Sequence, residues 1–189
     1  MEGTCKATIM DGPAMQRALT RIAHEIVERN EGSTDLALVG IIRRGETLAN
    51  RLADEMESIQ GVRPEIGSLD ISFYRDDVTR NIAPVLHATH IPFTVDKRNI
   101  ILVDDVLFTG RTVRSALNAL MDYGRPSKVQ LAVMVDRGHR ELPIRADFVG
   151  KNVPSSHEED VRVYVTPLDD RDAVEIWDVS SKKKKGGAE

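Results

Sequence analysis

The sequence predicts an α/β domain with a mostly parallel central sheet flanked by helices. Helix-like and strand-like segments alternate along the 189 residues, an order typical of this fold class. Residues 36–42, LALVGII, form a continuous apolar run, as expected for a strand buried on both faces of a parallel sheet. The sequence contains no internal repeat and no domain boundary. We therefore expect one domain over residues 1–180 and a disordered lysine-rich tail over residues 181–189.

The individual elements follow from local patterns. Residues 6–10 predict a short strand, and Pro13 suits the first turn of the next helix, with Asp11 or Gly12 as its cap. The apolar stripe of this helix recurs at helical spacing and consists of Met15, Leu19, Ile22 and Ile26. The other predicted strands are 36–42, 66–74, 99–106 and 128–136, with short ones near 147–150, 161–166 and 174–178, and the other predicted helices are 46–59 and 112–122.

Residues 75–98 do not fit this alternation. The stretch begins with polar residues, contains Pro84 and Pro92, and has no sustained period. Loops of this length in a compact domain are usually functional or mobile. We therefore expect a long functional or mobile loop here.

Composition narrows the class of protein. Hydrophobic residues make up 41% and charged residues 30%, as in an ordinary globular protein. Cys5 is the single cysteine, so one chain can build neither a disulfide nor a cysteine-rich zinc site, which fits a cytoplasmic location. No run approaches the roughly 18 apolar residues of a membrane helix, so no membrane partner is expected. The net charge of −4 argues against indiscriminate nucleic-acid binding but leaves room for a local basic patch.

The most informative segment is residues 101–112, ILVDDVLFTGRT. An apolar strand ends in two carboxylates, Asp104 and Asp105, and a glycine-containing turn then leads into a helix. Backbone N–H groups and the helix dipole at such a point favour an anion, and Gly110 lets the backbone approach a phosphate closely. The carboxylates can accept hydrogen bonds from ribose hydroxyls, with Mg²⁺ reducing their repulsion of a phosphate. The donors that this segment offers to a phosphate are Thr109, Arg111 and Thr112.

This segment resembles the signature of type I phosphoribosyltransferases, in which a hydrophobic strand precedes two acidic residues, two apolar residues, an often acidic position and Thr-Gly-(Lys/Arg)-Thr. Purine-using members often have Asp where this chain has Phe108, so the residue weakly favours a pyrimidine base, or a nucleobase that needs no carboxylate at that position. The resemblance implies a small hood, a flexible loop, and binding of 5-phosphoribosyl-1-pyrophosphate (PRPP) with Mg²⁺ held through the substrate. It also implies a pyrophosphate loop at residues 40–45, GIIRRG, which places Arg43 and Arg44 there. Closer relatives often have Thr at the position of Arg43.

Three further segments resemble the PyrR family of pyrimidine operon attenuation regulators, which also have uracil phosphoribosyltransferase activity. These are residues 135–154, which contain DRGHRELP, residues 17–25 and residues 69–77. The resemblance extends from about Lys6 to Trp177. It implies that the chain converts uracil and PRPP to UMP and pyrophosphate. It also implies that the chain binds a pyrimidine-operon mRNA leader hairpin under the control of UMP or UTP, and that it forms a homodimer or homotetramer.

The resemblance assigns roles residue by residue. Asp104, Asp105 and Arg44 are the expected catalytic residues. Arg137 and Val161 are expected at the base, and Tyr74, Arg75 and Asp76 begin the loop that closes over the site. The expected PRPP contacts are Arg43, Arg44, Asp104, Asp105, Val106, Leu107, Phe108, Thr109, Gly110, Arg111 and Thr112.

The expected RNA contacts lie in two segments. The helix that begins near Pro13 carries polar residues spaced three and four apart, and DRGHRELP lies in the second segment. The best assignments are Thr20, His24 and Arg140, followed by Arg17, Arg21, His139 and Arg145. Two alternatives remain: a phosphoribosyltransferase without RNA regulation, and a regulator that uses the pocket only to sense nucleotides. The intact Asp-Asp and Thr-Gly-Arg-Thr residues argue against the second.

Overall fold

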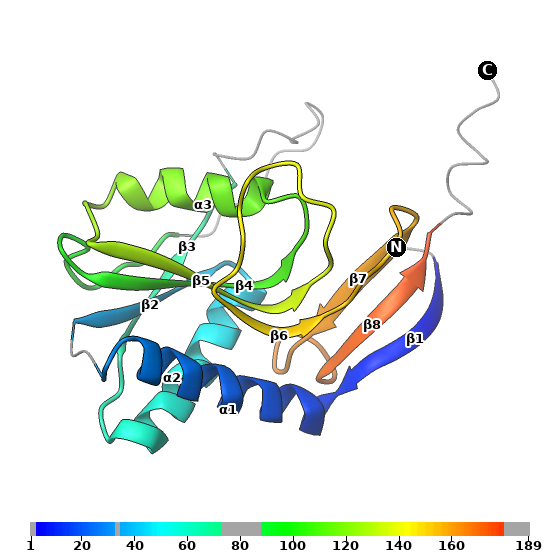
Figure 1. Cartoon of the computed structure of the whole chain (residues 1–189), viewed down its shortest axis with the longest axis horizontal. Coiled ribbons are helices and arrows are strands. Elements are labelled where there is room, and N and C mark those ends of the chain that lie inside the picture. Colours follow the sequence, from blue (N-terminus) through cyan, green and yellow to red (C-terminus); the bar gives the residue numbers. More distant parts are fainter. Residues whose placement is uncertain (1–2, 33–34, 73–87, 180–189) are drawn as a thin grey trace.

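A computed structural model describes residues 3–32, 35–72 and 88–179 of the chain. At its centre lies a parallel sheet of five strands in the order β3-β2-β4-β5-β6 (Figure 1). These strands are β2 (Leu36–Ile41), β3 (Glu65–Leu69), β4 (Asn99–Leu107), β5 (Lys128–Asp136) and β6 (Phe148–Asn152). Every residue of β2 is buried, because helices cover both faces of a parallel sheet.

Three helices form the outer layers. The helices α1 (Gly12–Arg29) and α2 (Arg44–Gln60) pack together on one face of the sheet, and α3 (Arg111–Met121) covers the other (Figure 1). Asp11 caps α1, since its carboxylate accepts a hydrogen bond from the backbone N–H of Ala14 at 2.8 Å. Met15, Leu19, Ile22 and Ile26 are all buried, which confirms the predicted apolar stripe.

A second, antiparallel sheet stands beside the central sheet and forms the hood (Figure 1). Its strand order is β1-β8-β7, with β1 (Thr4–Asp11), β7 (Glu159–Tyr164) and β8 (Ala173–Asp178). The first strand of the chain thus pairs with the last one, which holds the hood to both ends of the fold. The predicted α/β class, the mostly parallel sheet and the hood are confirmed.

The predicted strand over residues 66–74 is wrong at its carboxyl end, because β3 ends at Leu69. Asp70 turns the chain there: its carboxylate accepts hydrogen bonds from the backbone N–H and the hydroxyl of Ser72. Such a local bond offers the backbone an alternative to the ladder. The predicted loop start at Tyr74, Arg75 and Asp76 and the predicted tail over residues 181–189 lie outside the described residues.

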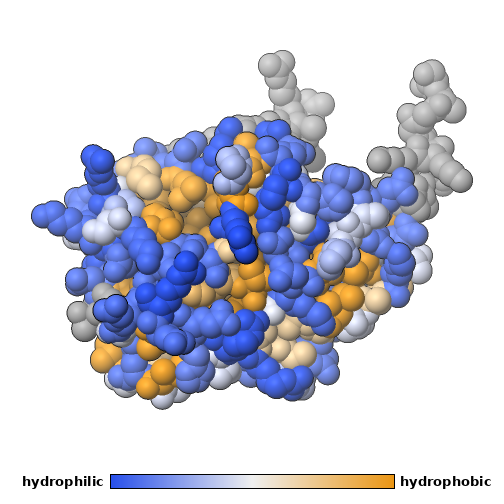
Figure 2. All heavy atoms as spheres, in the orientation of Figure 1, coloured by the Kyte–Doolittle hydropathy of each residue, from blue (hydrophilic) through white to orange (hydrophobic). Residues whose placement is uncertain are grey.

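Polar residues cover most of the face seen in Figure 2, and apolar residues gather in several separate places. The large apolar side chains that are exposed are Val62, Met121, Tyr123 and Leu168. Among the described residues, no helix is long and apolar enough to cross a membrane.

Candidate functional site

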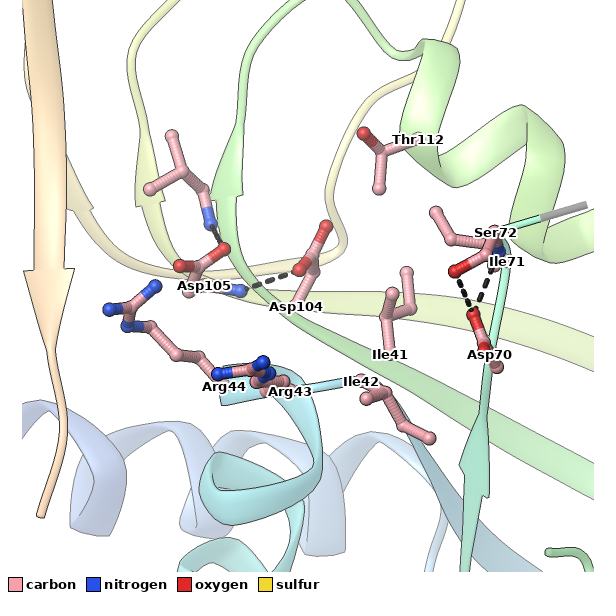
Figure 3. A pocket seen from close by; sticks show the side chains of 11 residues that line it. Ile41, Ile42, Arg43, Arg44, Asp70, Ile71, Ser72, Asp104, Asp105 and Thr112 are labelled. Carbon is pink, nitrogen blue, oxygen red and sulfur yellow. Dashed lines mark hydrogen bonds between the residues drawn. The ribbon is translucent and has the colours of Figure 1, made fainter. Parts of the chain in front are cut away.

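The carboxyl ends of β2, β3 and β4 meet at one edge of the central sheet and open into a cavity of ≈ 370 Å³ (Figure 3). Pockets of roughly 300–1,000 Å³ are typical of small-molecule sites, and the carboxyl edge of a parallel sheet is where they form. The cavity is lined by Ile41, Ile42, Arg43, Arg44, Asp70, Ile71, Ser72, Asp104, Asp105, Val106 and Thr112. The structure therefore brings the acidic pair and the arginine pair predicted from the sequence into one cavity.

The acidic pair is held by the backbone at the tip of β4. Asp104, 6% exposed, accepts a hydrogen bond from the N–H of Asp105 at 2.9 Å, and Asp105 accepts one from the N–H of Val106 at 2.8 Å. Burial raises the pKa of Asp105, while the charge of Arg44 and the hydrogen bonds to the carboxylate oppose this rise. The two carboxylates are thus fixed acceptors facing the cavity, suited to the hydroxyl pair of a sugar.

The turn after β4 forms the start of α3. Gly110 has a φ of 92°, which favours glycine, and a Cβ there would lie 3.3 Å from the Cβ of Ile144. A second pocket opens here and is lined by Val106, Leu107, Phe108, Thr109, Gly110, Arg111, Thr112, Val113 and Glu141. This turn and the amino end of α3 have the geometry expected of a phosphate site.

The loop between β2 and α2 contains a cis peptide bond between Ile42 and Arg43. Its two glycines allow close packing: a Cβ on Gly45 would lie 2.3 Å from the carbonyl oxygen of Val103, and one on Gly40 would lie 2.4 Å from the Cα of Glu46. The loop therefore lies directly against the tip of β4. Arg43 is exposed on this loop and lines the cavity.

Arg44 makes a bidentate ion pair with a residue of the hood. Its Nε and Nη2 donate hydrogen bonds to the carboxylate of Asp169, at 3.0 and 2.8 Å. Asp169 belongs to the turn between β7 and β8, so this contact joins the central sheet to the hood. Figure 3 shows the guanidinium of Arg44 lying beside Asp105.

A third pocket joins the acidic pair to β7 of the hood. It is lined by Arg44, Asp105, Asp160, Val161, Arg162, Val163 and Tyr164. Val161, the residue predicted at the base, is 6% exposed and lines this pocket. The structure thus places Val161 and Asp105 at the same pocket.

Arg137, the other residue predicted at the base, is 6% exposed and bound to the chain leading into β7. Its guanidinium donates hydrogen bonds to the hydroxyl of Ser155 and to the carbonyl oxygens of Ser156 and Glu159, at 2.6–3.0 Å. It also lies 4.1 Å from the ring centre of Phe108. Burial lowers the pKa of Arg137. In this conformation Arg137 supports the pocket walls, so a direct contact with the base stays a prediction.

The residues predicted to contact RNA on α1 lie mainly at the surface. Arg17, Arg21 and His24 are exposed, while Thr20 is partly buried and donates its hydroxyl to the carbonyl oxygen of Gln16. Arg21 also donates hydrogen bonds to the carbonyl oxygens of Val149 and Gly150, at 2.9 and 2.7 Å. Arg21 therefore also ties α1 to β6.

The residues of the second segment that are predicted to contact RNA differ in how exposed they are. Arg140 faces inward: its guanidinium contacts Asp136 and donates hydrogen bonds to the carbonyl oxygens of Phe108 and Ile144, at 2.6 and 2.9 Å. His139 contacts the carbonyl oxygen of Ser155, and only Arg145 is exposed. A direct contact of Arg140 with RNA therefore stays a prediction.

Comparisons with known proteins agree with this geometry. A family model described as the phosphoribosyl transferase domain matches residues 7–171. The structure is similar to hypoxanthine phosphoribosyltransferases from Staphylococcus aureus (TM-score 0.68, 17% identity, 93% of this chain and 96% of that one) and Trypanosoma cruzi (TM-score 0.72, 16% identity, 100% and 99%). At such identities the structural likeness shows the fold alone. Fold and family model together place the chain among the phosphoribosyltransferases.

Curated relatives narrow the family further. The chain is 55% identical over 176 residues to proteins named bifunctional protein PyrR from Bacillus cereus strain B4264 and Bacillus anthracis strain CDC 684. The matches cover 92% of this chain and 98% of each relative. The chain belongs to the PyrR family.

The sequence does not single out Asp70, Ser72 and Asp160, which line the cavities, or Asp169, which pairs with the cavity residue Arg44. Asp70 lies inside the predicted strand over residues 66–74, so the strand pattern gives no signal that the chain turns there. The run Asp169-Asp170-Arg171-Asp172 offers an acidic cluster, but no local pattern shows which of its members meets Arg44.

Proposed function

We propose that the residues described above carry out the two activities of a PyrR protein at separate places in the fold. The chain is a uracil phosphoribosyltransferase that forms UMP and pyrophosphate from uracil and PRPP. It is also a regulator of pyrimidine genes that binds RNA. One observation supports the enzymatic site. Asp104 and Asp105 lie between the turn at Gly110, which precedes α3, and the loop with Arg43, which precedes α2.

Each group of residues binds a different part of the two substrates. Asp104 and Asp105 accept hydrogen bonds from the two ribose hydroxyls, and the turn from Phe108 to Thr112 holds the 5′-phosphate. Arg43 and Arg44 bind the pyrophosphate, whose negative charge grows as it leaves the anomeric carbon. Uracil lies against the backbone of Val161, so that its N1 is presented to the same carbon. The protein thus mainly positions two substrates and stabilises the leaving group.

Magnesium suits the acceptors that are present. Among the described residues no group of three or more His, Cys, Asp or Glu side chains could hold a metal ion, whereas Asp104 and Asp105 offer carboxylate oxygens at the cavity. Mg²⁺ is commonly bound by one or two carboxylates together with substrate phosphates. When bound with PRPP, it neutralises charge on the pyrophosphate. The two aspartates would hold it through the substrate.

The enzymatic assignment predicts that Asp105→Ala lowers kcat/KM for PRPP by about 100-fold or more, the scale of losing one positioning contact. UMP formation with labelled PRPP, measured across uracil, cytosine, hypoxanthine and guanine, tests this prediction and the base preference together. Asn50→Ala, an exposed change on α2, serves as the control. Wild-type kinetics in Asp105→Ala, or a purine preferred over uracil, would contradict the assignment.

The RNA assignment is favoured by the exposed polar face of α1, with Arg17, Arg21 and His24. We expect His24→Ala to weaken binding of a pyrimidine-operon leader hairpin about tenfold while UMP synthesis stays normal, because the loss of one contact costs roughly 1–3 kcal/mol. Gel-shift titrations with and without UMP measure this, with Asn50→Ala again as the control. Binding that is unaffected by His24→Ala and by Arg17→Ala would exclude this face. The same samples in analytical ultracentrifugation distinguish the proposed dimer from a tetramer.

A further inference from the structure

Asp169 is the acidic partner of the proposed pyrophosphate ligand Arg44, and its own position is fixed. The N–H of Asp169 donates to the carbonyl oxygen of Val165 at 2.9 Å, and the N–H of Val165 donates back to the Asp169 carboxylate at 2.8 Å. The side chain of Asp169 is 15% exposed. The turn between β7 and β8 therefore presents a rigid carboxylate to the start of α2.

Arg44 offers more donors than Asp169 uses. A guanidinium has five N–H donors, of which the two hydrogen bonds to Asp169 engage Nε and Nη2. The remaining donors make no hydrogen bond to any residue that the structure describes. Arg44 lines both the cavity of the acidic pair and the pocket beside β7. One edge of the guanidinium is thus clamped while the other edge faces the site.

A similar pair two helical turns further along α2 shows what a purely structural clamp looks like. Arg51 binds Asp172 with both nitrogens of its fork, at 2.7 and 3.0 Å, and also the carbonyl and hydroxyl oxygens of Thr166, at 2.8 and 2.7 Å. Neither Arg51 nor Asp172 lines the cavity of the acidic pair or the pocket beside β7. The chain therefore supplies a matched pair that docks α2 on the same turn away from the substrate cavities.

We propose that Asp169 is a positioning residue of the transfer reaction, which holds Arg44 so that its free edge meets the pyrophosphate. Orientation matters because an arginine fork binds a phosphate by fixed, planar geometry, whereas a freely rotating one must lose rotamer entropy on binding. The acidic partner also ties this orientation to the hood, whose β7 lines the base side. The proposal rests on the assignment of Arg44 to pyrophosphate.

The test compares Asp169→Asn with Asp172→Asn in the full chain. We expect Asp169→Asn to lower kcat/KM for PRPP by about 10- to 100-fold, the scale of losing a residue that orients a binding group. The inhibition constant of magnesium pyrophosphate should weaken in parallel, while KM for uracil stays within about twofold. Asp169→Glu, which restores the charge, should recover part of the loss. Asp172→Asn should lower Tm without a selective effect on PRPP or pyrophosphate.

A double-mutant cycle with Arg44→Gln decides whether Asp169 acts through Arg44. We expect Asp169→Asn to cost nothing further once Arg44 is replaced. Equal losses in both backgrounds, unchanged pyrophosphate inhibition, or a general loss like that of Asp172→Asn would overturn the proposal. If Arg44→Gln itself behaves as wild type, the assignment of Arg44 to pyrophosphate is wrong instead.

Arg44→Lys provides a second test if Asp169→Asn is too unstable to assay. Lysine keeps the charge but cannot pair with Asp169 through a fork. Weakened pyrophosphate inhibition at an unchanged Tm supports the role of orientation. Wild-type inhibition would show that charge alone is enough and would overturn the proposal.

Discussion

At the scale of single residues, Asp105 shows how the site sets the charge of a proposed catalytic group. Burial raises the pKa of its carboxyl, and the guanidinium of Arg44 lowers it. The ionised carboxylate is the stronger acceptor for a ribose hydroxyl, because all of its oxygen lone pairs are available and it carries a charge. We therefore expect the activity to depend on the balance between the burial of Asp105 and the charge of Arg44.

This balance predicts the acid limb of the pH profile. Because the pKa of Asp105 is raised, kcat/KM for PRPP should fall at a pH above the range of an ordinary carboxyl, about 3.9. Removing the opposing charge in Arg44→Gln should move this limb to higher pH in the residual activity. Initial rates between pH 4 and pH 8 measure both profiles. A limb at the same pH in both proteins would refute the proposed link between Arg44 and Asp105.

Gln130 is a buried polar residue that allows a test of how an unpaired amide affects stability. It lies on β5, is 2% exposed, and its amide oxygen and nitrogen have no hydrogen-bond partner among the described residues. It shares a face of the strand with Ala132 and Met134, both of which belong to the core beneath α1 and α2. A buried amide without partners costs about 1–3 kcal/mol.

We therefore expect Gln130→Met to raise the free energy of unfolding by about 1 kcal/mol, because a flexible apolar side chain of similar length replaces an unpaired amide. Urea unfolding followed by circular dichroism measures the change, and Gln130→Glu provides the opposite case, which should be destabilising. A stability loss in Gln130→Met would mean that the amide is satisfied in solution.

At the scale of elements, two arginine–aspartate pairs join α2 to the turn between β7 and β8. Arg51 and Asp172 are 21% and 22% exposed, and hydrogen bonds from Arg51 are the largest cause that lowers the pKa of Asp172, to about 2. The pKa of Asp172 in the folded state therefore lies below the ordinary value of 3.8, so the pair stabilises the fold above that pH. This stabilisation is lost as the pH falls from about 4 towards 2.

Asp172→Asn should therefore cost about 1–2 kcal/mol at pH 7, after allowing for the screening of a partly exposed pair. The difference from wild type should shrink as the pH approaches 2, where the wild-type carboxyl is itself protonated. Urea unfolding at pH 7 and at pH 3 tests both statements. A difference that stays constant with pH would show that the loss comes from packing and not from charge.

At the scale of the whole molecule, the two sites proposed for catalysis and for RNA binding lie in different layers. The substrate cavities lie at the carboxyl edge of the central sheet, and the exposed residues of α1 lie on the layer beneath it (Figure 1). The loop from Arg137 to Arg145 contacts the turn before α3, since Arg140 donates a hydrogen bond to the carbonyl oxygen of Phe108 and Arg137 packs on the ring of Phe108. Because the α1 face lies apart from the substrate cavities, we expect a variant on α1 to affect RNA binding without affecting catalysis.

Much of this could be predicted from the sequence because the signals are local. The apolar run of β2, the stripe of α1 and the cap at Asp11 each depend on residues within one element. The segment over residues 101–112 is similarly compact, so its strand, turn and helix were predicted together. The end of β3 was not, because the Asp70 turn competes with a strand pattern that continues past it.

By itself, the sequence determined the order of the elements, the family and the residues that gather at the phosphate turn. Only the tertiary structure decided which distant charges pair: Arg44 with Asp169, and Arg51 with Asp172. The physical reason is distance along the chain. Hydrophobic periodicity and turn chemistry act within a few residues, whereas an ion pair between positions 44 and 169 depends on how two sheets pack.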